Sequence, residues 1–158
     1  EARDDGERAQ DADGHVALRV LGLLGGRRDD VEADEREEHD RGAGHDAGDA
    51  VLRGFAARVK RVVRTVDLVC RLGGEEFVVV MPETPADVAA LVAERLRASI
   101  AATPFALEQG TRAIPVTTSI GLAERGVEKS PEALVRAADR ALYDSKRAGR
   151  NRVTAAAA

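Results

Sequence analysis

A pair of adjacent glycines between two short apolar runs constrains the fold of this chain more than any other feature of its sequence. The segment 73–76, Gly-Gly-Glu-Glu, separates the β-like runs 67–72 and 77–81. Glycine adopts positive φ angles at little cost, so Gly73 and Gly74 favour a tight turn between these runs. The sequence therefore predicts a β-hairpin whose turn is followed at once by two carboxylates.

Three other segments have the apolar spacing of amphipathic helices, with hydrophobic residues recurring every three or four positions. Residues typical of helix starts and ends flank each segment. These boundary residues are Asp49 as N-cap of the first helix, Thr84 as N-cap with Pro85 and Pro104 for the second, and Ser130, Pro131 and Gly149 for the third.

Further strands are expected at residues 105–107, 113–122 and 152–154. One more strand could form at Val16–Leu24, the only sustained apolar stretch before residue 44. Helices that alternate with strands and a hairpin predict an α+β fold, a mixed α/β sandwich in which helices pack on the faces of one sheet.

Charge divides the chain into two parts. Residues 1–49 hold 16 acidic and 7 basic side chains, whereas residues 50–158 hold 12 acidic and 17 basic ones. The basic second part could attract a phosphorylated ligand. The acidic first part has few apolar residues outside its one candidate strand, so we expect a loop, a solvated helix or disorder there.

Several classes of protein are disfavoured by composition. The chain has four aromatic residues and a small net negative charge, which argues against a nucleic-acid partner. A single cysteine, Cys70, allows no intrachain disulfide, and no apolar run is long enough to span a membrane. No signal peptide is recognisable, so a cytoplasmic protein or part of a larger protein is expected, without membrane contact from this segment.

The carboxylates of Glu75 and Glu76 lie where glycine backbone lets a ligand approach closely. Carboxylate oxygens are preferred ligands of Mg²⁺, which also retains waters and binds substrate phosphates. A glycine turn with exposed glutamates is also common in proteins without any such function, so these residues alone leave both interpretations open.

Four ordered blocks of sequence extend this pattern. They are Gly-His-Asp-Ala-Gly-Asp at 44–49, Arg-Thr-Val-Asp-Leu-Val-Cys-Arg-Leu-Gly-Gly-Glu-Glu-Phe at 64–77, Ser-Ile-Gly at 119–121, and the segment from Ala138 to Asn151. With these blocks the chain resembles the GGDEF family, the catalytic domain of diguanylate cyclases, in its GGEEF variant. The resemblance covers about residues 44–153. We expect residues 44–158 to form the catalytic domain, with 1–43 as an atypical acidic segment.

The resemblance implies a nucleotidyl-cyclase-like fold with a ferredoxin-like βαββαβ core and a mostly antiparallel central sheet. It implies condensation of two GTP molecules into cyclic di-GMP with release of two pyrophosphates, with Mg²⁺ or Mn²⁺ as cofactor. Glu75 would bind the metal and act as base, and Glu76 is a second candidate for both roles. The residues implied to bind substrate are Gly73, Gly74, His45, Asp49, Lys146 and Arg150.

Two of these assignments have ordinary structural alternatives. A carboxylate such as that of Asp49 suits the donor-rich edge of guanine, but it could equally be a plain helix N-cap. Lys146 and Arg150 would neutralise phosphate charge, but cations in a last helical turn also interact favourably with the helix dipole.

The resemblance also implies an inhibitory site for the product. Arg64 and Asp67 form an Arg-x-x-Asp pattern ahead of Gly73, and Arg95 matches an arginine that some family members add. A guanidinium offers paired donors to guanine or phosphate, and an aspartate accepts from the base edge. The alternative is an exposed ion pair between Arg64 and Asp67 that contributes under about 1 kcal/mol.

The sequence departs from the family pattern before residue 44. Glu32 and Asp34 fall at the positions of an Asp-x-Asp pair, so Glu32 is a candidate metal ligand. Glu37 stands where the family has lysine, and Asp40 stands at the guanine-reading asparagine, where a carboxylate lacks the amide donor. The helical Asp-x-Leu-Thr-Gly-Leu segment is absent. Either an out-of-frame translation over residues 1–43 or true divergence would explain this.

Three functions are therefore open at this point. The first is a diguanylate cyclase that acts as a homodimer and is controlled by a sensor or receiver domain in the full-length protein. The second is a catalytically impaired GGDEF domain that binds cyclic di-GMP or GTP and regulates a partner. The third is a structural α/β interaction domain, which the four motif blocks disfavour.

Overall fold

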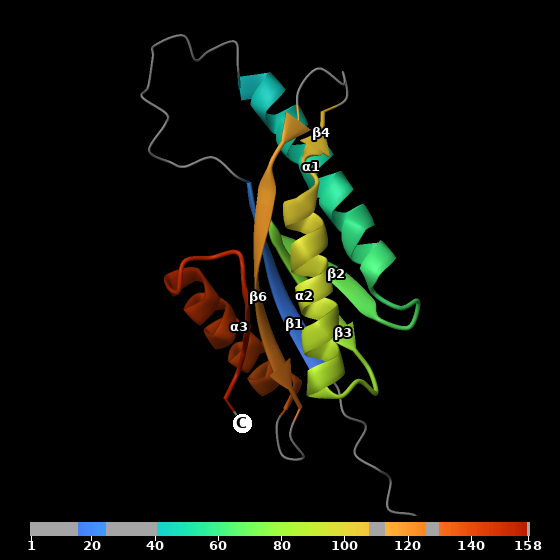
Figure 1. Cartoon of the computed structure of the whole chain (residues 1–158), viewed down its shortest axis with the longest axis vertical. Coiled ribbons are helices and arrows are strands. Elements are labelled where there is room, and N and C mark those ends of the chain that lie inside the picture. The colour runs from blue at the N-terminus through green and yellow to red at the C-terminus, as the bar shows by residue number, and fades with distance from the viewer. Residues whose placement is uncertain (1–15, 25–40, 108–112, 126–129, 158) are drawn as a thin grey trace, which may run out of the picture.

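Figure 1 shows the computed structural model of the chain, which describes residues 16–24, 41–107, 113–125 and 130–157, with side chains from residue 47 onward. The helices are α1 (Arg41–Val62), α2 (Ala86–Ala102) and α3 (Pro131–Arg147). The strands are β1 (Val16–Leu24), β2 (Leu68–Gly73), β3 (Glu76–Met81), β4 (Phe105–Ala106), β5 (Ala113–Ile114), β6 (Val116–Glu124) and β7 (Val153–Ala155).

One five-stranded sheet organises the described residues, with strand order β2-β3-β1-β6-β7. All neighbouring pairs are antiparallel except β6 and β7, which run parallel. The elements β1, α1, β2, β3, α2 and β6 follow one another as βαββαβ. This architecture confirms the predicted α+β class, and the candidate strand Val16–Leu24 is the middle strand of the sheet.

Helices cover both faces of the sheet. In Figure 1, α1 and α2 lie on one side and α3 lies on the other, against β6. The main core lies between α1, α2 and the sheet, where apolar side chains are almost fully buried. Its members include Phe55, Val59, Phe77, Met81, Leu96, Ile100 and Ile120.

The opposite layer is held close by a glycine in β6. A Cβ atom on Gly121 would lie 2.1 Å from the carbonyl oxygen of Ala138 and 2.3 Å from the amide nitrogen of Leu142, both in α3. No side chain fits in that space, so Gly121 lets α3 pack directly against the strand.

Two predicted helix starts are wrong. α1 begins at Arg41, so Asp49 lies inside the helix and does not cap it. α2 begins at Ala86 with Pro85 at the N-cap position, and Thr84 does not cap it. The Thr84 hydroxyl is used elsewhere, because it donates to the Pro82 carbonyl and accepts from Arg64.

The remaining boundaries agree closely with expectation. The Ser130 hydroxyl accepts a hydrogen bond from the Ala133 amide at 3.3 Å, as an N-cap does, and Gly149 follows α3 with φ of +106°. The strand expected at 113–122 is divided by Pro115 into β5 and β6. The turn expected at 108–110 lies outside the described residues. Within the part of the chain that is described, no helix is long and apolar enough to cross a membrane.

Candidate active site

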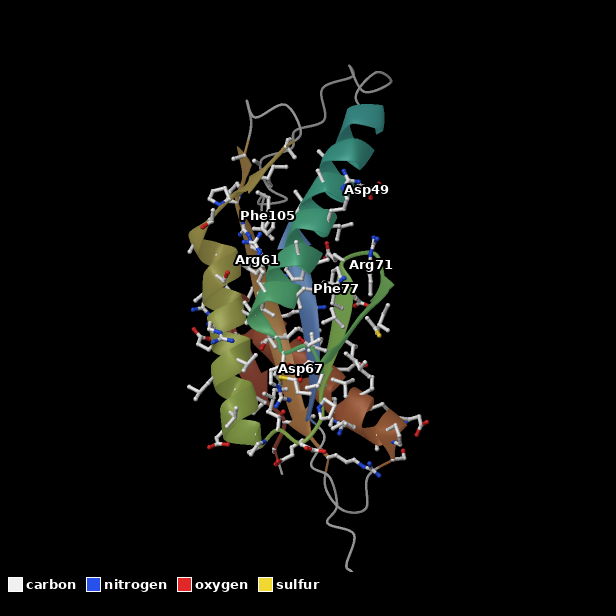
Figure 2. All side chains as sticks on the ribbon, turned by 90° about the vertical axis from the view of Figure 1, so that its right-hand side faces the viewer. Asp49, Arg61, Asp67, Arg71, Phe77 and Phe105 are labelled. Carbon is white, nitrogen blue, oxygen red and sulfur yellow. The ribbon has the colours of Figure 1, made fainter. Side chains whose placement is uncertain are left out.

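A groove of about 440 Å³ runs between α1 and the edge of the sheet formed by β2 and β3. Figure 2 shows three of its residues, Asp49, Arg71 and Phe77, on the same side of α1. The groove has an apolar floor and charged side chains around it. Its lining residues are Asp49, Leu52, Arg53, Ala56, Lys60, Val69, Arg71 and Phe77. We call this feature the α1–β2 groove.

The helical wall of the groove follows from spacing along α1. Residues 49, 53, 56 and 60 are three or four positions apart, so they share one face of the helix. Asp49 is exposed, and its carboxylate makes no hydrogen bond or ion pair with the described part of the chain. The N-cap alternative for Asp49 therefore fails, and its oxygens are available to a ligand.

The strand wall follows from the alternation of β2. Val69 and Arg71 line the groove and face α1, whereas Leu68 and Cys70 alternate with them and face the other side of the sheet. Phe77 of β3 forms the floor and lies with its ring centroid 5.1 Å from that of Phe55. The Nε atom of Arg71 donates to the Gly74 carbonyl oxygen at 2.8 Å, which ties the groove to the hairpin turn.

The turn itself consists of Gly74 and Glu75, and Gly73 pairs with Glu76 at the end of the ladder. Gly74 has φ of +50°, in the left-handed region that favours glycine, as the sequence predicted. Glu75 and Glu76 are both half-buried. Adjacent carboxylates at this turn fit a hard cation such as Mg²⁺, which needs only one or two protein carboxylates.

No set of three His, Cys, Asp or Glu side chains is close enough to hold a metal within the described ranges. The third predicted ligand, Glu32, lies outside those ranges, as does Asp40. His45 lies in α1, but its side chain is not described. Among the described residues, Glu75 and Glu76 therefore remain the predicted metal ligands.

The predicted phosphate-binding cations lie at the end of α3. Lys146 is in its last turn, and Arg150 follows it with φ of +58°, a backbone conformation that is uncommon for arginine. Neither residue lines the α1–β2 groove.

A second polar cluster lies beyond the C-terminal end of α1, where Figure 2 shows Asp67. The Asp67 carboxylate is buried and accepts hydrogen bonds from the Arg64 backbone amide at 2.7 Å and from Arg64 Nη2 at 2.8 Å. The Arg64 guanidinium also donates to the Pro82 carbonyl and to the Thr84 hydroxyl. The hydrogen bonds that the Arg64 guanidinium donates to the Asp67 carboxylate raise the pKa of Arg64 above its ordinary value.

Arg95 is held beside this cluster by a hydrogen bond to the C-terminal end of α1. Its Nη2 atom donates to the carbonyl oxygen of Val62, the last residue of α1, at 2.6 Å. Cations are favourable near the C-terminus of a helix, where carbonyl groups lack helical partners. The structure thus brings Arg95 near the Arg64–Asp67 pair. We call Arg64, Asp67, Thr84 and Arg95 the arginine cluster.

Sequence reasoning missed several groove residues. Leu52, Arg53 and Lys60 share the helical face of Asp49, a signal that was present but depended on α1 starting earlier. Arg71 was missed as well, although its position two residues before the glycine pair could have suggested a role at the turn.

Comparison with known proteins gives concordant results. Residues 35–152 match the family described as diguanylate cyclase, GGDEF domain. The response regulator PleD of Caulobacter vibrioides is 48% identical over 116 residues, which cover 73% of this chain and 26% of PleD. The diguanylate cyclase DgcP of Pseudomonas aeruginosa is 42% identical over 113 residues, which cover 72% of this chain and 16% of DgcP. The chain thus spans about a quarter or less of the length of these two relatives.

Solved structures agree with the sequence matches. The GGDEF domain of DgcB from Caulobacter crescentus, crystallised in complex with c-di-GMP, has a TM-score of 0.74 and 30% identity, with 90% of this chain and 78% of that chain covered. The active GGEEF domain of a diguanylate cyclase from Vibrio cholerae has a TM-score of 0.71 and 27% identity, with 92% and 84% covered. The family match, these identities and the shared fold establish that this chain belongs to the GGDEF family.

Proposed function

We propose that the chain is the catalytic domain of a diguanylate cyclase, which condenses two GTP molecules into cyclic di-GMP and two pyrophosphates. The observation that carries this proposal is the α1–β2 groove, where the Asp49 carboxylate has no partner among the described residues and Arg71 links the groove to the Gly74–Glu75 turn. Its apolar floor suits a flat base, and its surrounding cations suit an anionic ligand. Relatives named as diguanylate cyclases support the same reaction.

Each of these residues has its own role in the proposed reaction. Asp49 accepts hydrogen bonds from the N1 and N2 donors of guanine, which adenine does not offer in the same arrangement. Gly73 and Gly74 let phosphate oxygens approach the backbone closely. Glu75 takes the proton of a 3′-hydroxyl as that oxygen attacks the α-phosphorus of the second GTP, and pyrophosphate leaves. Lys146 and Arg150 balance the charge of the triphosphate.

Glu75 and Glu76 would hold Mg²⁺ or Mn²⁺. When bound, such a cation stabilises the negative charge that develops on the phosphate oxygens. A half-buried pair of carboxylates on a tight turn fits this role, because the remaining positions of the cation are filled by waters and phosphates.

Two GTP-bound domains must face each other, because the product is two-fold symmetric and each nucleotide attacks the other. A homodimer is therefore the active form. In the full-length protein a regulatory domain controls how often the two catalytic domains meet, as the name response regulator suggests for the relative PleD.

The arginine cluster serves as an inhibitory site for the product. Arg64 keeps half of its side-chain surface exposed, so its outer face is open to a guanine or a phosphate of cyclic di-GMP. Arg64→Ala should weaken cyclic di-GMP binding at least tenfold, measured by calorimetry, with Arg61→Ala as the control. Equal affinities for cyclic di-GMP in wild type and Arg64→Ala would show that Arg64 and Asp67 have only a structural role.

A second candidate function rests on residues 32–40, where Glu37 and Asp40 differ from the family pattern. A domain that lacks those groups but retains the arginine cluster would bind cyclic di-GMP without making it. Incubation with GTP and Mg²⁺, followed by chromatography for cyclic di-GMP, separates the two functions. A cyclase forms product with a specific activity that rises with protein concentration, whereas a receptor forms none and still binds added cyclic di-GMP.

A further inference from the structure

The β2–β3 hairpin departs from a regular ladder just before its turn. Arg71 pairs with Phe77 and Gly73 pairs with Glu76, so Leu72 is an extra residue on β2 with no partner on β3. A bulge of this kind interrupts the ladder hydrogen bonds and bends the strand. The two carboxylates of the candidate active site therefore follow the least regular part of the sheet, and the turn needs another source of rigidity.

A hydrogen bond from Arg71 spans this irregular part of the hairpin. Its Nε atom donates to the Gly74 carbonyl oxygen at 2.8 Å, across the bulge. The Gly74 carbonyl belongs to the peptide unit that joins Gly74 to Glu75, and a peptide unit is planar. Holding the oxygen therefore restrains the plane of this peptide and with it the position of the Glu75 Cα atom, from which the side chain extends.

The Arg71 side chain belongs to the groove as well as to the turn. Arg71 also lines the α1–β2 groove, beside Val69 and opposite Asp49. In the described part of the chain its only polar interaction is the one with Gly74. One side chain thus links the wall of the groove to the carboxylate turn.

We propose that Arg71 is a positioning residue of the candidate active site, which holds the Gly74–Glu75 peptide so that the Glu75 carboxylate is directed toward a nucleotide in the α1–β2 groove. This inference rests on the proposed function and deepens it. The essential group is the Nε–H donor, and the charge of the guanidinium has a separate effect on the affinity for an anionic ligand.

Two substitutions separate the donor from the charge. In Arg71→Gln, the Nε2 atom lies the same number of bonds from the backbone as Nε of arginine, so a donor to Gly74 is kept without the charge. In Arg71→Met, a side chain of similar length has neither donor nor charge. Arg61→Met is the matched control, because Arg61 is exposed on α1, and Figure 2 shows it on the other side of that helix from Arg71.

The first readout is hydrogen exchange at the amides of residues 73–76 in the full chain. We expect Arg71→Met to speed this exchange about tenfold, because losing one hydrogen bond makes local opening easier, whereas Arg71→Gln stays within about twofold of wild type. Equal exchange in wild type and Arg71→Met would overturn the proposal. This readout needs no turnover, so it holds even for an inactive chain.

The second readout is the kinetics of cyclic di-GMP formation. We expect kcat to fall about tenfold in Arg71→Met and to recover to within about threefold in Arg71→Gln, while KM for GTP rises equally in both because both lack the charge. Equal loss of kcat in the two variants would overturn the positioning role. A wild-type chain that forms no cyclic di-GMP would instead contradict the proposed function, and the exchange experiment would still decide the role of Arg71.

Discussion

The α1–β2 groove runs along α1 from Asp49 to Lys60, whereas the arginine cluster lies beyond the C-terminal end of that helix. Their polar side chains are used in opposite ways. In the groove, the Asp49 carboxylate is exposed and has no partner among the described residues. In the cluster, the Asp67 side chain is 1% exposed, and Arg64 occupies both of its oxygens. The groove offers its carboxylate to a ligand, whereas the cluster first stabilises the fold and can bind a ligand only through its outer surface.

The largest difference should appear when the two aspartates are compared. Asp67→Ala should lower the free energy of unfolding by about 2 kcal/mol, because it removes a buried acceptor and leaves an amide and a guanidinium without their partner. Asp49→Ala should change it by less than about 0.5 kcal/mol, because an exposed side chain without contacts is lost. Urea unfolding of both variants measures this. Similar losses of unfolding free energy in the two variants would contradict this difference between the two aspartates.

A smaller effect tests whether the cluster extends to the β3–α2 connection. Thr84 is buried, and its hydroxyl accepts from Arg64 and donates to Pro82. Thr84→Val keeps the shape and removes the hydroxyl, so we expect a loss of about 1 kcal/mol in unfolding free energy. Thr84→Ser keeps the hydroxyl and serves as the control. A valine variant no less stable than the serine variant would show that this hydroxyl does not stabilise the fold.

The smallest effect has the opposite sign and lies beside the groove. Gly48 is inside α1, and a Cβ atom there would meet no described atom within 4 Å apart from its chain neighbours and the backbone of its own helix. Gly48→Ala should therefore raise the unfolding free energy by about 0.5–1 kcal/mol through helix propensity. Thermal unfolding checks the sign. A destabilised variant would mean that the start of α1 needs the glycine for another reason.

Periodicity predicted most of the fold because each helix and strand keeps a clear apolar pattern from residue 51 onward. The start of α1 was not predicted, because its first eight residues include Gly42, Gly44 and Gly48, and local propensity disfavours helix there. Thr84 was mistaken for an N-cap because its sequence neighbours fit that role, while its actual partner, Arg64, is 20 residues away. Local sequence cannot reveal such a distant partner.

The candidate site likewise has one part that local sequence predicts and contacts that it does not predict. The carboxylate turn could be predicted, because paired glycines and the residues after them form a local pattern. The hydrogen bond from Arg95 to Val62 spans 33 residues and depends on how α1 and α2 pack. The hydrogen bond from Arg71 to Gly74 is local, but it depends on the bulge at Leu72. No residue in this part of the sequence indicates that bulge.

We propose that the turn beside the α1–β2 groove carries out nucleotide condensation. Formation of cyclic di-GMP from GTP and Mg²⁺ by wild type and Glu75→Gln tests this claim most directly, with Glu124→Gln, an exposed glutamate at the far end of β6, as the control. We expect Glu75→Gln to lose at least 100-fold in rate, with an unchanged unfolding midpoint, because it removes charge and basicity but little volume. An active wild type matched within a few-fold by Glu75→Gln, at the same Mg²⁺ dependence, would contradict the account.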